Sequence, residues 1–184
     1  METTTHKKGL PAWLVLCIIA VIAGGLLGGT NLLTQSRIKE QIAITAEAVR
    51  KQVLPEASSF NKLAIADDAI VDYCYEGING GVVGYVCQVT TTGYHGDIEV
   101  TVGLNTSGGV TGISVGGASF SETPGLGAKV KEPNFTDQFT GLITPLAVVQ
   151  DGGDVDSITG ATRSSRAVAN AVNAAAQYIS TIGG

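Results

Sequence analysis

A cluster of hydroxyl-bearing and small residues stands directly before a long helical pattern near the C-terminus. It runs from Asp156 to Thr162 with the sequence Asp-Ser-Ile-Thr-Gly-Ala-Thr, and apolar periodicity predicts a helix over 162–180. The first N–H groups of a helix lack intrahelical acceptors, and the helix dipole favours negative charge at that end. The segment therefore suits a phosphate group, while a simple cap by Thr159 or Thr162 would use the same residue types.

A second unusual segment runs from Ser121 to Lys129, with the sequence Ser-Glu-Thr-Pro-Gly-Leu-Gly-Ala-Lys. Its closely spaced proline and glycines predict a tight loop whose backbone can approach a flat ligand. Leu126 adds an apolar side chain between flexible neighbours. Taken alone, this pattern is also typical of an ordinary turn.

The elements that must position these segments are read from hydrophobic periodicity. Alternating runs rich in β-branched residues predict four antiparallel strands at 69–76, 82–90, 97–104 and 110–115. Asn79-Gly80-Gly81 predicts a tight hairpin, and 105–109 a longer turn. A short helix at 134–139, a further strand at 146–150 and the C-terminal helix complete an α+β domain.

The N-terminal region is suited to a lipid bilayer. Residues 10–33 are almost wholly apolar and long enough to cross it as one helix, and a helical stalk over 34–55 follows and ends at Pro55. A cleaved signal peptide would share the basic start, but the apolar run is too long and no Ala-x-Ala site follows it. Basic residues flank both ends of the span, so charge alone does not orient it.

Charge and metal-ligand spacing exclude two classes of function. From Pro55 onward the chain has 5 Lys/Arg against 13 Asp/Glu, a net charge of −8, which repels nucleic acid. The two histidines, His6 and His95, form no cluster, and no Cys-x-x-Cys pair occurs, so we expect no metal site.

Cys74 and Cys87 fall on the first two predicted strands. A Gly80-Gly81 loop would place them directly opposite each other, whereas an Asn79-Gly80 loop would make them diagonal neighbours. Direct opposition permits a disulfide outside the cytoplasm. The frequency with which free cysteines are buried favours two reduced side chains on one sheet face.

The two motifs occur in a fixed order behind a single N-terminal span. Together, Glu122-Thr123-Pro124-Gly125-Leu126-Gly127 and Asp156-x-x-Thr159-Gly160-Ala161-Thr162 resemble the two signatures of the FMN-binding domain shared by the RnfG and NqrC subunits. The stretches 93–98 and 134–141 resemble that family's turn into its central strands and its short helix.

The resemblance implies a covalent flavin rather than a catalytic side chain. A flavin transferase would use FAD to attach FMN, as a phosphoester, to Thr162. The rest of the recognition motif would be Asp156, Thr159, Gly160 and Ala161. The flavin ring or ribityl chain would contact the first motif, at Glu122, Thr123, Gly125, Leu126 and Gly127, and Lys129 would act on it electrostatically.

The resemblance also implies a role and a place in the cell. The protein would relay electrons in a membrane-bound, ion-translocating ferredoxin:NAD oxidoreductase, the Rnf complex, beside membrane, flavin and iron–sulfur subunits. It would cross the inner membrane once, with residues 1–9 in the cytoplasm and 56–184 outside it as the FMN-binding domain. The compact length favours the Rnf branch.

Three alternatives remain open at this stage. One is an NqrC-like subunit of a Na⁺-translocating NADH:quinone reductase. Another is a membrane-anchored reductase or regulatory domain that binds FMN noncovalently. The third is a pilin-like structural protein, but the segment after Lys8-Gly9 begins Leu-Pro-Ala-Trp-Leu and lacks the glutamate expected at its fifth position.

Overall fold

A computed structural model describes residues 11–66, 69–117 and 120–182. The chain forms two compact units, Met1–Thr45 and Ala46–Gly184. The predicted N-terminal segment 1–9 and the expected first residue of the span, Leu10, lie outside the described residues.

The first unit consists of the long helix α1, Ala12–Val53, which continues into the second unit. Its stretch Ala12–Asn31 has a mean hydropathy of 2.4 and is long and apolar enough to cross a membrane. No proline interrupts the helix, and Pro55 follows its end. The predicted span and stalk are therefore one continuous helix.

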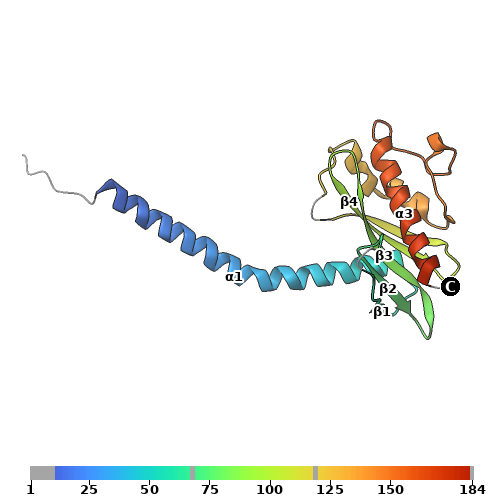
Figure 1. Ribbon diagram of the computed structural model, residues 1–184, viewed down its shortest axis with the longest axis horizontal. Coiled ribbons are helices and arrows are strands. Elements are labelled where there is room, and N and C mark those ends of the chain that lie inside the picture. Colours follow the sequence, from blue (N-terminus) through green and yellow to red (C-terminus); the bar gives the residue numbers. More distant parts are fainter. Residues whose placement is uncertain (1–10, 67–68, 118–119, 183–184) are drawn as a thin grey trace, which may run out of the picture. The chain divides into compact units, whose positions relative to one another are not determined.

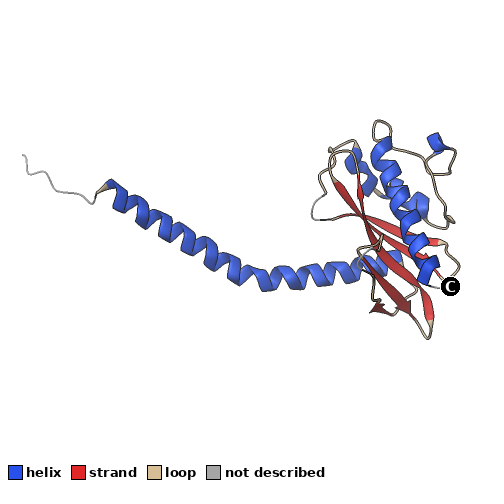
Figure 2. Ribbon diagram, viewed as in Figure 1, coloured by secondary structure: helices blue, strands red, loops and turns tan. Residues whose placement is uncertain are grey.

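The second unit is built on one antiparallel sheet, with its strands in the order in which they occur along the chain (Figures 1 and 2). The strands of the described residues are β1 Ser59–Lys62, β2 Tyr73–Ile78, β3 Val82–Thr92, β4 Asp97–Asn105 and β5 Val110–Gly116. The mainly antiparallel meander is confirmed, with two corrections. Sequence periodicity missed β1, whose four residues are mostly exposed, and it began β2 too early, at Ala69.

The hairpin between β2 and β3 differs from both loops considered above. Its turn contains three residues, Asn79 to Gly81, and the amide of Asn79 donates to the carbonyl of Gly81 at 2.8 Å. A bulge between Gly77 and Ile78 compensates for the extra residue. Cys74 and Cys87 consequently lie directly opposite each other.

Helix α3, Thr162–Ile182, covers one face of the sheet (Figure 1). Its buried stripe is made of small residues that recur at helical spacing, and it packs on the apolar face of β3 and β4. The stripe comprises Ala167, Val168, Ala171, Val172 and Ala175. The predicted C-terminal helix is therefore confirmed, and its stripe forms part of the main core.

The last residues of α1 pack on the opposite face of the sheet. Val53 and Leu54 are buried there in a second, smaller core. Close approach requires Gly103 on β4, because a Cβ atom at this position would overlap the carbonyl of Val53. The hydroxyl of Thr111 donates to that carbonyl at 2.5 Å, so β5 caps the end of α1.

Short helices connect β5 to α3. They are η1 Gly127–Lys131, α2 Pro133–Thr136, η2 Asp137–Phe139 and η3 Val149–Asp151. The predicted short helix at 134–139 is confirmed as α2 and η2. The predicted strand at 146–150 is wrong: Val148 forms only an isolated bridge with Val155, and the chain then turns into η3.

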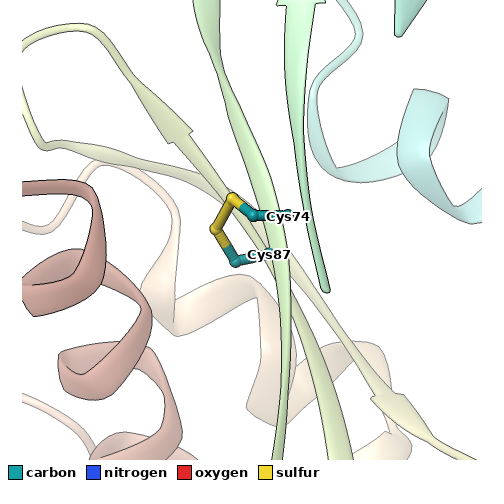
Figure 3. Close-up of a disulfide and its surroundings, with 2 residues drawn as sticks. All are labelled: Cys74 and Cys87. Atoms are coloured by element: carbon teal, nitrogen blue, oxygen red, sulfur yellow. A yellow bond between two sulfur atoms is a disulfide. The ribbon is translucent and has the colours of Figure 1, made fainter. Parts of the chain in front are cut away.

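Cys74 and Cys87 form a disulfide between β2 and β3 (Figure 3). Both residues are fully buried, within the core that packs against α3. The expectation of two free thiols is therefore wrong. The bulge described above produces the direct opposition that the bond requires.

We expect the disulfide to stabilise the second unit substantially. Converting both Cys74 and Cys87 to Ala should lower the free energy of unfolding by about 2–4 kcal/mol, because the unfolded chain loses a short covalent loop and the core loses two sulfur atoms. Urea denaturation of the full chain in detergent, with and without reductant, measures this. Equal unfolding midpoints for the wild type and the double variant would contradict the prediction.

Candidate functional site

The second motif forms a sharp turn into α3. Gly160 has a φ of +79°, a conformation that side chains rarely adopt, and the amide of Ala161 donates to the carbonyl of Ile158 at 2.9 Å. The buried hydroxyl of Ser165 accepts from the amide of Ile158 and donates to the carbonyl of Ala161, each at 3.1 Å. These bonds fix Thr162 as the first residue of α3, half-buried at its N-terminus.

The start of α3 presents unused hydrogen-bond donors. Among the described residues, the amides of Thr162, Arg163 and Ser164 have no protein acceptor. The first turn of the helix contains no acidic residue. A phosphate oxygen suits this set of donors, because it can accept the N–H groups and place negative charge at the positive end of the helix dipole.

The first motif is held by the buried carboxylate of Glu122, which is only 5% exposed. Its Oε1 accepts from the amides of Tyr94 and His95, at 2.7 and 3.0 Å. Its Oε2 accepts from the hydroxyl of Ser164 at 2.8 Å. One side chain thus joins the β3–β4 turn, the first motif and the first turn of α3.

The surroundings of Glu122 favour its charged form. Burial by itself would raise the pKa of this carboxyl, but the hydrogen bonds from His95, Ser164 and Tyr94 and the charge of His95 outweigh burial and lower the pKa. Gly127 makes room for the carboxylate, since a Cβ atom at that position would overlap Oε2. The glycine of the first motif is therefore a packing requirement.

The two motifs meet at Leu126 and Gly160. A Cβ atom placed on Gly160 would lie 3.3 Å from Cδ2 of Leu126, so the leucine side chain lies against the turn that precedes Thr162. Leu126 is nevertheless 46% exposed, and its neighbours Thr123, Pro124 and Gly125 are exposed as well. The loop therefore offers an accessible apolar surface next to Thr162.

The remaining predicted site residues occupy different surroundings. Gln138 on η2 holds the backbone of Asp156: its Oε1 accepts from the amide at 2.7 Å and its Nε2 donates to the carbonyl at 3.4 Å. The Asp156 side chain is exposed, as is Thr159. Lys129 lies exposed on η1 and forms no hydrogen bond or ion pair with another described residue of the two motifs.

Sequence reasoning missed four residues that complete the site. The amides of Tyr94 and His95 bind Glu122, Ser164 donates to it, and Nε of Arg163 donates to the carbonyl of Gly93 at 3.0 Å. The stretch 93–98 was recognised only as a turn into the central strands. Its link to Glu122 spans 28 positions in the chain, so local patterns do not reveal it.

The described residues contain no group of three His, Cys, Asp or Glu side chains placed to hold a metal ion. The site that the fold assembles is instead a set of amide donors beside an exposed loop.

Two family models match this chain. The model of the FMN-binding domain matches residues 93–177, which include both motifs and the turn that Glu122 holds. The model of the RnfG N-terminal region matches residues 12–53, the extent of α1. Fold and site thus define the class as an FMN-binding domain that follows an apolar N-terminal helix.

The curated relatives narrow the class to one family. The G-type subunit of the ion-translocating oxidoreductase complex of Methanosarcina acetivorans is 36% identical, over 90% of this chain and 91% of the relative. The G-type subunit of the Na⁺-translocating ferredoxin:NAD⁺ oxidoreductase complex of Acetobacterium woodii is 32% identical, with 89% and 88% covered. The chain therefore belongs to the RnfG family, as the two motifs predicted.

A solved structure agrees with the fold. The C-type subunit of the Na⁺-translocating NADH-quinone reductase of Parabacteroides distasonis matches with a TM-score of 0.51 and 24% identity, over 61% of this chain and 63% of that one. The α+β fold predicted from the sequence is confirmed.

We expect Glu122 to make stability depend on pH. Because the folded-state pKa lies below the ordinary value, the carboxylate stabilises the fold above about pH 4.3, and this stabilisation is lost as the pH falls through the folded-state pKa. Glu122→Gln should cost about 1–3 kcal/mol at pH 7, since the amide replaces a charged acceptor.

Urea denaturation of both proteins between about pH 3 and pH 7 measures this difference. It should shrink toward the acidic end, where the wild-type carboxyl is protonated. A difference that stays constant over the whole range would show that the charge of Glu122 contributes nothing.

Proposed function

We propose that this chain is the electron-carrying flavoprotein subunit of an Rnf complex, with FMN esterified through its phosphate to Thr162. The observation that carries the proposal is the position of Thr162. This residue lies at the start of α3, beside unused amide donors and the exposed loop of the first motif. The match to the FMN-binding domain supports the choice of ligand.

Attachment needs little chemistry from this chain. A flavin transferase brings FAD, the Oγ atom of Thr162 attacks the phosphorus of the FMN half, and the anhydride bond to AMP breaks. AMP leaves and the hydroxyl proton is lost. The product keeps one negative charge on its phosphodiester, which the N–H groups of Thr162, Arg163 and Ser164 stabilise at the helix terminus.

The residues of the two motifs take separate parts in holding the cofactor. Gly160 and Ala161 form the turn that presents Thr162, and Asp156 and Thr159 are the exposed part of the sequence that the transferase recognises. Thr123, Gly125 and Leu126 contact the flavin from the loop, while Glu122 and Gly127 support that loop from the interior. Lys129 acts from η1 through its charge.

Bound FMN supplies one-electron and two-electron redox chemistry, and the protein sets its orientation and exposure. Thr162 is thus an attachment point and not a catalytic nucleophile. The names of the relatives support a role in a ferredoxin:NAD⁺ oxidoreductase that translocates ions. The neighbours would be other membrane, flavin and iron–sulfur subunits of that complex.

The domain would lie outside the cytoplasm, with the chain crossing the inner membrane once and residues 1–9 inside. The span of α1 supports the membrane assignment. The buried disulfide supports the side, because such bonds persist in oxidising compartments and are rare in the cytosol.

The attachment is tested by intact mass and by fluorescence of the denatured gel band, on full chain produced together with a flavin transferase. Wild type should gain the mass of one FMN less one water and remain fluorescent, whereas Thr162→Val should do neither. Ser157→Ala, a hydroxyl removed from the same segment, is the matched control and should still be modified. Flavin that is released on denaturation from wild type would instead support noncovalent binding.

The orientation is tested with protease added to spheroplasts. Residues 56–184 should be digested from intact spheroplasts and protected in inverted membrane vesicles. Protection in spheroplasts and digestion in inverted vesicles would place the domain in the cytoplasm.

A further inference from the structure

Two arginines lie near the start of α3, where the helix dipole makes a positive charge unfavourable. Arg166 is neutralised by Asp151: Nε donates to Oδ2 at 2.5 Å and Nη2 donates to Oδ1 at 2.6 Å. Arg163 forms no ion pair with any carboxylate of the described residues. The two side chains therefore differ in electrostatic surroundings although they lie three residues apart on one helix.

Arg163 is exposed but not free to take any orientation. Its Nε donates to the carbonyl of Gly93, and the next two amides of that turn bind the buried carboxylate of Glu122. Within the described part of the chain, the Nη1 and Nη2 groups have no acceptor. The guanidinium is thus tied at one nitrogen, next in sequence to Thr162, with its other donors available.

A purely structural role accounts poorly for this arrangement. A neutral donor such as glutamine could bind the carbonyl of Gly93 without placing a charge at the positive end of the helix. The domain from Pro55 onward is strongly acidic, with only 5 Lys/Arg, so a cation without a partner at this position is uncommon in the chain. An anion carried by Thr162 would supply the missing partner.

We propose that Arg163 is the positive charge that faces the FMN carried by Thr162 and that it raises the reduction potential of this flavin. The inference rests on the proposed function. Reduction adds electron density to the flavin, and a nearby cation stabilises the more negative form. The net charge of −8 on the domain acts in the opposite direction, and Arg163 offsets that charge locally.

The test compares three variants of the full chain after flavin loading. Arg163→Gln removes the charge, Arg163→Lys keeps it, and Arg166→Gln removes a charge from the same part of α3, where Asp151 already neutralises it. Intact mass gives the extent of loading. The midpoint potential is then measured by equilibrium redox titration followed through flavin absorbance.

We expect Arg163→Gln to lower the midpoint potential, Arg163→Lys to restore most of it, and Arg166→Gln to leave it near the wild-type value. The shift should shrink at high salt, since the guanidinium is exposed. Equal shifts in Arg163→Gln and Arg166→Gln, or no shift in Arg163→Gln, would overturn the proposal. So would failure of Arg163→Lys to recover the potential.

Loading separates the remaining outcomes. If folded Arg163→Gln stays unmodified while Arg163→Lys and Arg166→Gln are modified, the charge is already required when the phosphate arrives, which supports the proposal. If both glutamine variants stay unmodified, Arg163 has no special role and the proposal fails. Wild type without covalent flavin would instead refute the proposed function, which the mass spectrum reveals before any potential is measured.

Discussion

Glu122 joins three segments that are distant in the sequence, and the geometry beside Thr162 depends on that connection. A buried carboxylate is costly unless its oxygens are hydrogen-bonded, and here the partners are two amides of the β3–β4 turn and the hydroxyl of Ser164 on α3. The turn and the helix must therefore come together for the charge to be accommodated. The position of the loop is set by the protein before any ligand arrives.

The sheet gives this connection a rigid base. Helix α3 packs on β3 and β4 through small side chains, so its axis lies close to the sheet and its first turn is fixed relative to the β3–β4 turn. The disulfide joins β2 to β3 within the same core. Orientation of a cofactor by a protein requires this kind of support, because a site carried only by exposed loops would move.

Local sequence patterns predicted the parts of the fold whose cause is local. The apolar run of α1, the long strands β3 to β5 and the stripe of α3 all follow from periodicity. Strand β1 was missed because pairing with β2 forms it, and its four residues have no clear alternation. Residues 146–150 look like a strand, but only Val148 finds a partner.

The same limit applies to the site. Both motifs were visible because glycine, proline and hydroxyl residues are concentrated in short stretches. The role of Glu122, the tie between Arg163 and Gly93, and the bulge that aligns Cys74 with Cys87 depend on pairings between distant positions. A single sequence does not contain that information in local form, so the contacts around Thr162 emerged only from the tertiary structure.

The docking of α1 on the sheet decides where this protein can be cut. Val53 and Leu54 belong to the hydrophobic interior of the second unit, and the carbonyl of Val53 is bound by Thr111. A soluble fragment that begins at Ala46 retains both residues, whereas one that begins after Pro55 exposes the apolar surface around Gly103 and leaves Thr111 without its acceptor. The membrane helix thus contributes its final turn to the folding of the water-soluble domain.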